Sequence, residues 1–162
     1  MLRRLLVMRH AKSSWKSGAA TDHARPLNAR GRGAAPVVAA AMVEYGLVPD
    51  AVVASDAQRS RETWARCATL LPAPTLLRFT PTLYGSSLPA ILGELRATPS
   101  ACSTLLIIGH NPTWERLVFW LSDVDVVLKT AHVAVLEAAQ PSWKHGLSGP
   151  GAWNAVRVLR PR

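Results

Sequence analysis

The chain alternates short apolar runs with longer stretches in which apolar residues recur every three or four positions. Six of the apolar runs have the length of a strand and predict β-strands over residues 4–8, 51–54, 76–79, 104–108, 132–136 and 155–159. Helical patterns lie between the first four of them. This alternation of strands and helices is typical of an α/β fold with a mostly parallel sheet that helices cover on both faces.

Four helices are expected from periodicity and from the residues at their ends. Asn28 is suited to cap a helix over 29–45, and Gly46 is suited to end it. The pattern Ser55-Asp56-Ala57-Gln58 predicts a cap at Ser55 for a helix from 57 to about 71, which Pro72 would stop. The other two span 88–97 and the segment from Pro112 onward, where Asn111 is the expected cap.

The end of the chain departs from this alternation. The last two predicted strands are joined by a loop rich in Pro, Gly and Ser, residues 140–151, in which no helix is expected. Strands joined in this way can form an antiparallel pair at the edge of the sheet. With 162 residues, the chain is expected to form a single domain over 1–162.

Composition narrows the class of protein. Hydrophobic residues make up 49% of the chain, and no apolar run reaches the length of a membrane span. The apolar stretch that follows Arg4 ends at Met8, short of a signal-peptide core, so secretion is not expected. Cys67 and Cys102 stand apart without a CxxC pattern, which favours reduced thiols in the cytoplasm. The net charge of +9 comes without a nucleic-acid-binding motif, so it favours a positive field around a site for anionic substrates.

Two histidines follow predicted strands directly. His10 comes after Arg9 at the end of the first strand, and His110 comes after Gly109 at the end of the fourth. Ligands of open α/β sheets bind beyond the carboxyl ends of the strands. If His10 is a nucleophile it must be neutral, and the neighbouring charge of Arg9 is expected to lower its pKa. His110 is expected to donate a hydrogen bond to a transferring phosphoryl group.

Arginines are expected at the same edge. Arg59 follows the second strand by one helical turn and can point back toward the sheet, whereas Arg61 is assigned to a solvated face. Arg25 lies in the loop before the first helix and is a further candidate. Asp22 could orient Arg25 or be an ordinary loop carboxylate. Because guanidinium groups match phosphate oxygens bidentately, two histidines with these arginines predict a phosphoryl-group site.

Five segments together resemble the histidine phosphatase superfamily, also called phosphoglycerate mutase-like, and within it the short SixA-type phosphohistidine phosphatases. The segments are LVMRHAKSSW at 6–15, RPLNARG at 25–31, SDAQRSRET at 55–63, LY at 83–84 and GHNP at 109–112. They occur in the order of the family and span nearly the whole chain.

The resemblance implies a three-layer α/β/α sandwich with a mostly parallel central sheet of about six strands. It implies that His10 is the phosphorylated nucleophile, that Arg9, Arg59 and His110 form the phosphate pocket, and that Arg25 is a further contact. It implies neither metal nor cofactor. The expected substrate is a phosphorylated protein, most of all protein phosphohistidine.

One departure from the larger family members affects the expected activity. Residues 80–87, where those members carry a carboxylic general acid, contain no carboxylate, and Asp22 and Glu94 are weak candidates for that role. SixA-type proteins share this lack. Two alternatives stay open: a broad phosphomonoesterase acting on small metabolites, and a non-catalytic module that binds phosphoproteins. A metal hydrolase is disfavoured because the other histidines are scattered along the chain.

Overall fold

The computed structural model describes residues 1–161. Its centre is a six-stranded sheet in the order β3-β2-β4-β1-β5-β6. The strands are β1 (Leu2–Arg9), β2 (Ala51–Ser55), β3 (Leu76–Thr80), β4 (Thr104–Gly109), β5 (Val133–Ala139) and β6 (Asn154–Leu159). The first four are parallel to one another, β5 runs antiparallel to β1, and β6 runs antiparallel to β5. The predicted antiparallel edge pair is thereby confirmed.

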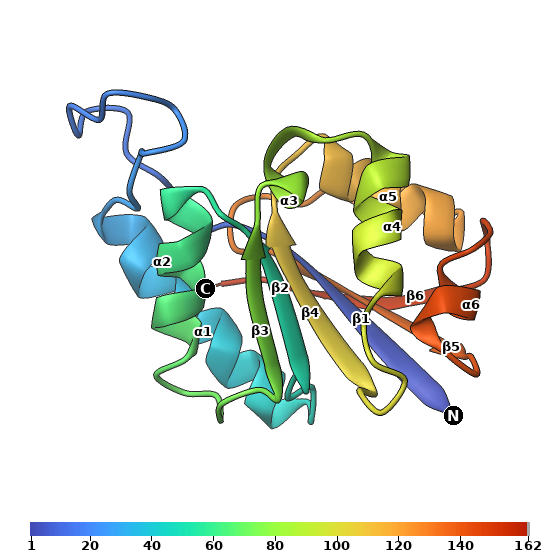
Figure 1. The fold of residues 1–162 in the computed structure, drawn as a ribbon. Helices are drawn as coiled ribbons and strands as arrows, with labels where there is room; N and C mark the ends of the chain where they lie inside the picture. Colours follow the sequence, from blue (N-terminus) through green and yellow to red (C-terminus); the bar gives the residue numbers. More distant parts are fainter. Residues whose placement is uncertain (162) are drawn as a thin grey trace.

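Helices lie on both faces of the sheet (Figure 1). They are α1 (Ala29–Glu44), α2 (Gln58–Cys67), α3 (Thr82–Gly85), α4 (Leu88–Arg96), α5 (Thr113–Ser122) and α6 (Trp143–Gly146). One core cluster joins α1 and α2 to one face of the sheet, and a second cluster joins α3 to α6 to the other face. The predicted three-layer α/β/α arrangement is confirmed.

Alternation along the central strands explains why both faces are covered. In β1, Leu5 and Val7 point into the cluster under α4 and α5, whereas Leu6 and Met8 point into the cluster under α1. All four side chains are fully buried. Successive side chains of a strand point to opposite faces, so a continuous apolar run is stable only between two helical layers.

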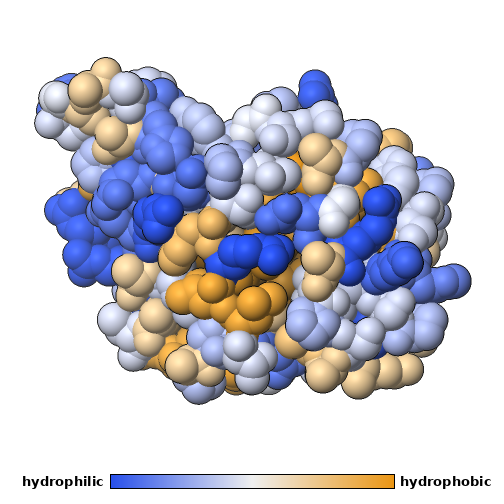
Figure 2. All heavy atoms as spheres, viewed as in Figure 1, coloured by the Kyte–Doolittle hydropathy of each residue, from blue (hydrophilic) through white to orange (hydrophobic). Residues whose placement is uncertain are grey.

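The edges of the sheet are less covered. Figure 2 shows hydrophilic residues gathered over α2 and an apolar area over β3, the edge strand on that side.

Among residues 1–161, no helix is long and apolar enough to cross a membrane. Cys67 and Cys102 are buried free thiols, one in each core cluster.

The beginning of α1 agrees with the prediction. The Asn28 side chain accepts a hydrogen bond from the N–H of Gly31 at 2.9 Å and caps the helix. Gly46 follows the end of the helix with a φ of +68°, a backbone conformation that glycine adopts without strain.

Two predicted caps are wrong. The N-cap of α2 is Ala57 and not Ser55, because the Ser55 hydroxyl lies at the end of β2. Asn111 does not cap α5, which begins at Thr113 after the N-cap Pro112; the Asn111 amide instead donates to the carbonyl oxygen of Leu128 at 2.8 Å. For Asn111 a tertiary contact replaces the local one that the sequence pattern favours, whereas Ser55 keeps a local hydrogen bond from the N–H of Ala57 and adds a tertiary contact.

Other boundaries also differ. Helix α2 ends at Cys67, before the predicted stop at Pro72, and the loop expected to lack a helix contains the single turn α6. The turn α3 after β3 was not predicted. The apolar residues expected to share one face of α5, among them Trp114 and Leu117, are buried as predicted.

Candidate active site

The two candidate histidines meet at the carboxyl ends of adjacent strands. In the register of β1 and β4, Arg9 lies opposite Gly109, so His10 and His110 leave the sheet side by side. The N–H of His10 donates to the carbonyl oxygen of Gly109 at 3.0 Å, and the two ring centroids are 5.0 Å apart. The structure therefore brings together the pair that the strand ends predict.

Gly109 allows a close packing contact beneath this pair. A Cβ atom at Gly109 would lie 2.6 Å from the ring of Trp114. The same ring donates a hydrogen bond from its Nε1 to the carbonyl oxygen of Met8 at 2.9 Å. Trp114 thus joins α5 to β1 at Met8, two residues before His10. Only glycine at position 109 leaves room for the Trp114 ring.

The His10 ring is held in one tautomer. Its Nδ1 lies 2.7 Å from the carbonyl oxygen of Ala11, which can only accept, so Nδ1 donates and Nε2 keeps the lone pair. Arg59 donates from its Nε to this Nε2 at 3.3 Å. The side chain is nearly buried, at 7% exposed.

The pKa of His10 is lowered to about 4. Burial is the main cause, and the positive charges of Arg59 and Arg9 lower it further, while the bond to Ala11 opposes the shift. The predicted direction is therefore confirmed, but the sequence analysis assigned the main effect to Arg9 rather than to burial. The imidazole is neutral at pH 7.

His110 is fixed by the end of β2. Its Nε2 lies 2.8 Å from the Ser55 hydroxyl, which also accepts from the N–H of Ala57 at 3.1 Å. The Ser55 hydroxyl thus joins the segment before α2 to His110 instead of capping the helix itself. Burial, with the neighbouring His10 and Arg59, lowers the pKa of His110 to about 3.

Asp22 connects the arginines. Its carboxylate accepts from Arg25 at 2.9 Å and from Arg59 at 3.0 Å, and its main-chain oxygen accepts from Arg59 at 2.8 Å. The Tyr84 hydroxyl also donates to the carboxylate of Asp22, at 2.7 Å. The sequence analysis left open whether Asp22 orients Arg25 or is an ordinary loop carboxylate. In the structure Asp22 contacts Arg25 and also Arg59, so it can orient both.

The ionisation of Asp22 follows from these contacts. The hydrogen bond from Tyr84, followed by the contact with Arg59, lowers the pKa of the carboxyl to about 2 although partial burial opposes the shift. Asp22 is therefore charged at neutral pH and cannot deliver a proton there.

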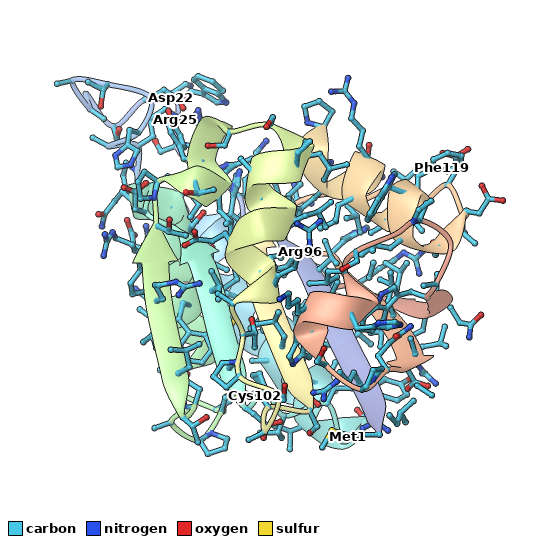
Figure 3. The ribbon with its side chains drawn as sticks, turned by 45° about the vertical axis from the view of Figure 1, so that its right-hand side comes forward. Met1, Asp22, Arg25, Arg96, Cys102 and Phe119 are labelled. Carbon is cyan, nitrogen blue, oxygen red and sulfur yellow. The ribbon has the colours of Figure 1, made fainter. Side chains whose placement is uncertain are left out.

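Arg25 and Arg9 complete the arginine set. Arg25 donates to the carbonyl oxygen of Ser14 and to the hydroxyl of Ser13, and its guanidinium carbon lies 3.4 Å from the centroid of the Trp15 ring. Arg9 donates to the carbonyl oxygen of Leu128 at 3.1 Å. Figure 3 shows Asp22 and Arg25 together in the loop beyond the carboxyl ends of the strands, at the opposite end of the molecule from Met1 and Cys102.

These side chains line one cavity of about 260 Å³. All five predicted site residues belong to its wall: Arg9, His10, Arg25, Arg59 and His110. The wall also includes Lys12, Ser13, Trp15, Asp22, Asn111 and Thr130. Lys12 and Thr130 were not expected there. The position of Lys12 two residues after His10 could have suggested it, whereas nothing in the sequence places the loop of Thr130 beside β1.

Several charged residues stay outside the cavity. Arg61 is exposed and donates to the main-chain oxygen of Asp56 at 2.9 Å, as its assignment to a solvated face predicts. Glu94 lies 3.4 Å from Arg78 in an ion pair. Within residues 1–161, no three His, Cys, Asp or Glu side chains cluster so that they could hold a metal ion.

Comparison with known proteins agrees with this geometry. Residues 5–80 match the model of the histidine phosphatase superfamily (branch 1). An uncharacterized chloroplastic protein of Arabidopsis thaliana is 34% identical over 173 residues, which cover 98% of this chain and 78% of the relative. An uncharacterized protein of Mycobacterium tuberculosis is 35% identical over 118 residues, with 73% of this chain and 72% of the relative covered.

Solved structures show the same fold over the whole length. The SixA protein of Nakamurella multipartitia superposes with a TM-score of 0.86 at 28% identity and covers 99% of this chain and 97% of that one. The protein histidine phosphatase SixA in complex with tungstate has a TM-score of 0.83 at 20% identity, with 98% and 97% covered. By sequence and by fold, the chain belongs to the histidine phosphatase superfamily and is of the SixA type.

Proposed function

We propose that the protein is a phosphatase that hydrolyses protein phosphohistidine through a phosphorylated His10. The observation that carries this proposal is the neutral His10 ring, whose Nδ1 is bound to Ala11 while its Nε2 lone pair faces Arg59. Family membership supports phosphatase activity. The 28% identical SixA protein, itself a candidate phosphohistidine phosphatase, supports the choice of substrate class.

In the first step, the phosphoryl oxygens bind the guanidinium groups of Arg9, Arg25 and Arg59. Arg59 exchanges its contact with His10 Nε2 for a phosphoryl oxygen, which frees the lone pair. Nε2 then attacks phosphorus, a P–N bond to His10 forms, and the bond from phosphorus to the leaving group breaks. His110, 5.0 Å away between ring centroids, donates to the phosphoryl group as charge develops on it.

In the second step, water attacks phosphorus in the phosphorylated His10. The P–N bond breaks, inorganic phosphate leaves, and the imidazole returns to its neutral form. The low pKa of His10 helps here, because the ring regains a free lone pair rather than holding a proton at neutral pH.

The preference for phosphohistidine follows from the lack of an acid. Asp22 is ionised, Glu94 is paired with Arg78, and the described wall of the cavity holds no other carboxylate. An alkyl phosphate expels a basic alkoxide, for which general acid catalysis typically contributes about 10²–10⁴ in rate. Phosphohistidine with a proton on its other ring nitrogen expels a neutral imidazole, whose conjugate acid has a pKa near ~6.5, so it needs far less help.

The test is a chemical quench followed by a comparison of substrates. Mixing with a labelled phosphodonor should give an acid-labile, base-stable adduct on the peptide that contains His10, and His10→Ala should abolish both adduct and turnover. The value of kcat/KM for a phosphohistidine peptide should exceed that for an alkyl monoester by at least ~10².

Other outcomes would select the alternatives. Comparable values for the two substrates would indicate a broad phosphomonoesterase that acts on small metabolites. Binding of the phosphopeptide without any phosphorylated enzyme would indicate a phosphoprotein-binding module. An active His10→Ala variant would contradict the proposed nucleophile.

A further inference from the structure

A second basic depression adjoins the candidate active site. It has a volume of about 350 Å³ and is lined by Arg9, Lys12, Arg30, Ala34, Lys129, Thr130, His132 and Pro161. Three of these residues, Arg9, Lys12 and Thr130, also line the catalytic cavity. The two hollows therefore share a wall, and one molecule can reach into both.

The lining of this depression is strongly basic, although the carboxylate of Glu115 acts on Arg9 and opposes the lowering of its pKa by burial. Its lining has four permanently basic side chains and no carboxylate. In the part of the chain that the structure describes, none of the ion pairs involves Arg9, Lys12, Arg30 or Lys129. The catalytic cavity differs, since Asp22 pairs with two of its arginines. Repulsion among like charges favours an anion in the adjoining depression.

A buried donor lies in the same wall without a partner. The Nε of Arg9 is buried, and within residues 1–161 it has no hydrogen-bond partner. Buried polar groups in folded proteins nearly always find a partner, so this donor in the wall of a basic depression points to a bound anion. His132 is buried in the same wall, and burial lowers its pKa while a hydrogen bond with the backbone of Val127 opposes the shift, so its neutral ring adds no charge.

The backbone holds the basic residues in place. A Cβ atom at Gly31 would lie 2.1 Å from the carbonyl oxygen of Lys12, and the N–H of Asn28 donates to that same oxygen at 3.0 Å. The first turn of α1 is thus pressed against Lys12, which brings Arg30 to the depression. This close approach requires glycine at position 31.

A tight turn at Ala131 positions Lys129 and Thr130, which line the other side of the depression. Ala131 has a φ of +63°, in the left-handed region that residues with a side chain rarely adopt. Its N–H donates to the carbonyl oxygens of both Arg9 and His10, at 3.0 and 3.1 Å. The turn therefore fixes Lys129 and Thr130 against the end of β1, next to the proposed nucleophile.

We infer that this depression is a second anion subsite, which takes an acidic group of the substrate while its phosphoryl group lies on His10. The inference rests on the proposed function and deepens it: preferred substrates carry a second anion close to the phosphoryl group. In a protein that anion is a Glu or Asp side chain near the phosphohistidine, and in a metabolite it is a second phosphate. Both offer the oxygen acceptors that Arg and Lys bind.

The first arm of the test uses phosphohistidine peptides that differ only by Glu or Gln near the phosphohistidine. The wild-type protein should prefer the Glu peptide in kcat/KM by roughly tenfold, the effect of one hydrogen bond between charged groups. The double variant Arg30→Gln/Lys129→Gln should lose this preference. A matched control, Arg66→Gln/Lys144→Gln, removes the same charge from exposed positions outside the depression and should keep it.

The second arm uses tripolyphosphate and inorganic phosphate as competing ligands, with binding measured by calorimetry. Tripolyphosphate can span both hollows, so its advantage over phosphate should fall by roughly tenfold in the double variant and stay in the control. A preference for the Glu peptide without a preference for tripolyphosphate identifies a carboxylate as the second anion. A preference for tripolyphosphate without a preference for the Glu peptide identifies a phosphate.

The inference is overturned if neither arm shows a preference in the wild-type protein, or if the control loses it as much as the double variant. Failure of the proposed function looks different. In that case no substrate phosphorylates His10, yet calorimetry still measures tripolyphosphate binding and still reports whether Arg30 and Lys129 contribute.

Discussion

Asp22 and Arg59 are joined at two points, from Nη2 to the carboxylate at 3.0 Å and from Nη1 to the main-chain oxygen at 2.8 Å. In the proposed mechanism this guanidinium must bind the phosphoryl oxygens. The carboxylate therefore has two opposing effects: it orients Arg59 and Arg25 before substrate binds, and it repels the anion that they bind.

We expect Asp22→Asn to bind vanadate, a mimic of pentavalent phosphorus, about 2- to 5-fold more tightly than the wild-type protein. The effect is small because the Asp22 side chain is about half exposed and water screens its charge. Inhibition constants measure it. Asp56→Asn is the matched control, since Asp56 pairs with His23 rather than with an arginine of the cavity. Weaker vanadate binding would mean that orientation of the arginines outweighs repulsion.

Arg59→Ala should lower kcat/KM on an aryl phosphate by roughly 10²–10³, as expected for loss of one strong electrostatic donor. Arg9→Ala should fall in the same range. Arg61→Ala should be nearly silent, because Arg61 is exposed and donates to the main-chain oxygen of Asp56. A critical Arg61 with a dispensable Arg59 would contradict the assignment of the two faces of α2.

Activity should survive a chelator. In the proposed mechanism, His10 supplies the nucleophile and three arginines supply the positive charge that metal-dependent phosphatases obtain from ions. Initial rates before and after treatment with EDTA measure this. Loss of activity that one divalent ion restores would contradict the mechanism.

The strand ends were the most informative part of the sequence. Parallel strands meet at one edge of a sheet, so the positions of His10 and His110 after their strands were sufficient to predict that they converge. Arg59 followed from the spacing of one helical turn after β2. These predictions depend on strand direction and helix period, which apolar patterns encode locally.

Caps and loops were harder to predict because a polar side chain has several partners to choose from. Ser55 has a good local pattern for a cap, yet its hydroxyl bonds His110, which is 55 residues away in sequence. Asp22 contacts Tyr84 across 62 residues. No periodicity encodes such contacts, and for the same reason Thr130 was missed in the cavity wall.

The pH dependence of stability should report the buried histidines. The pKa of His10 is about 4 in the folded protein and near ~6.5 when unfolded, so from pH 6.5 down to 4 only the unfolded chain takes up this proton. The free energy of unfolding should therefore fall as the pH falls through this window, by about 3 kcal/mol on account of His10.

Urea unfolding of the wild-type protein and of His10→Gln at pH 7 and pH 4.5 separates this contribution from that of other groups. The variant lacks the His10 proton and should lose less stability between the two pH values. An equal loss in both proteins would mean that His10 titrates near its usual pKa in the folded state.

Two glycines of α1 offer a last prediction, because they differ only in what surrounds them. At Gly31 a Cβ atom would lie 2.1 Å from the carbonyl oxygen of Lys12, whereas at Gly33 it would meet nothing within 4 Å. Gly31→Ala should destabilise the protein by about 1–3 kcal/mol, because backbone rather than a flexible side chain must move. Gly33→Ala should be neutral or stabilising by up to ~1 kcal/mol, since alanine is the better helix former. Denaturant midpoints measure both, and similar effects of the two substitutions would contradict the close approach of α1 to the loop that follows His10.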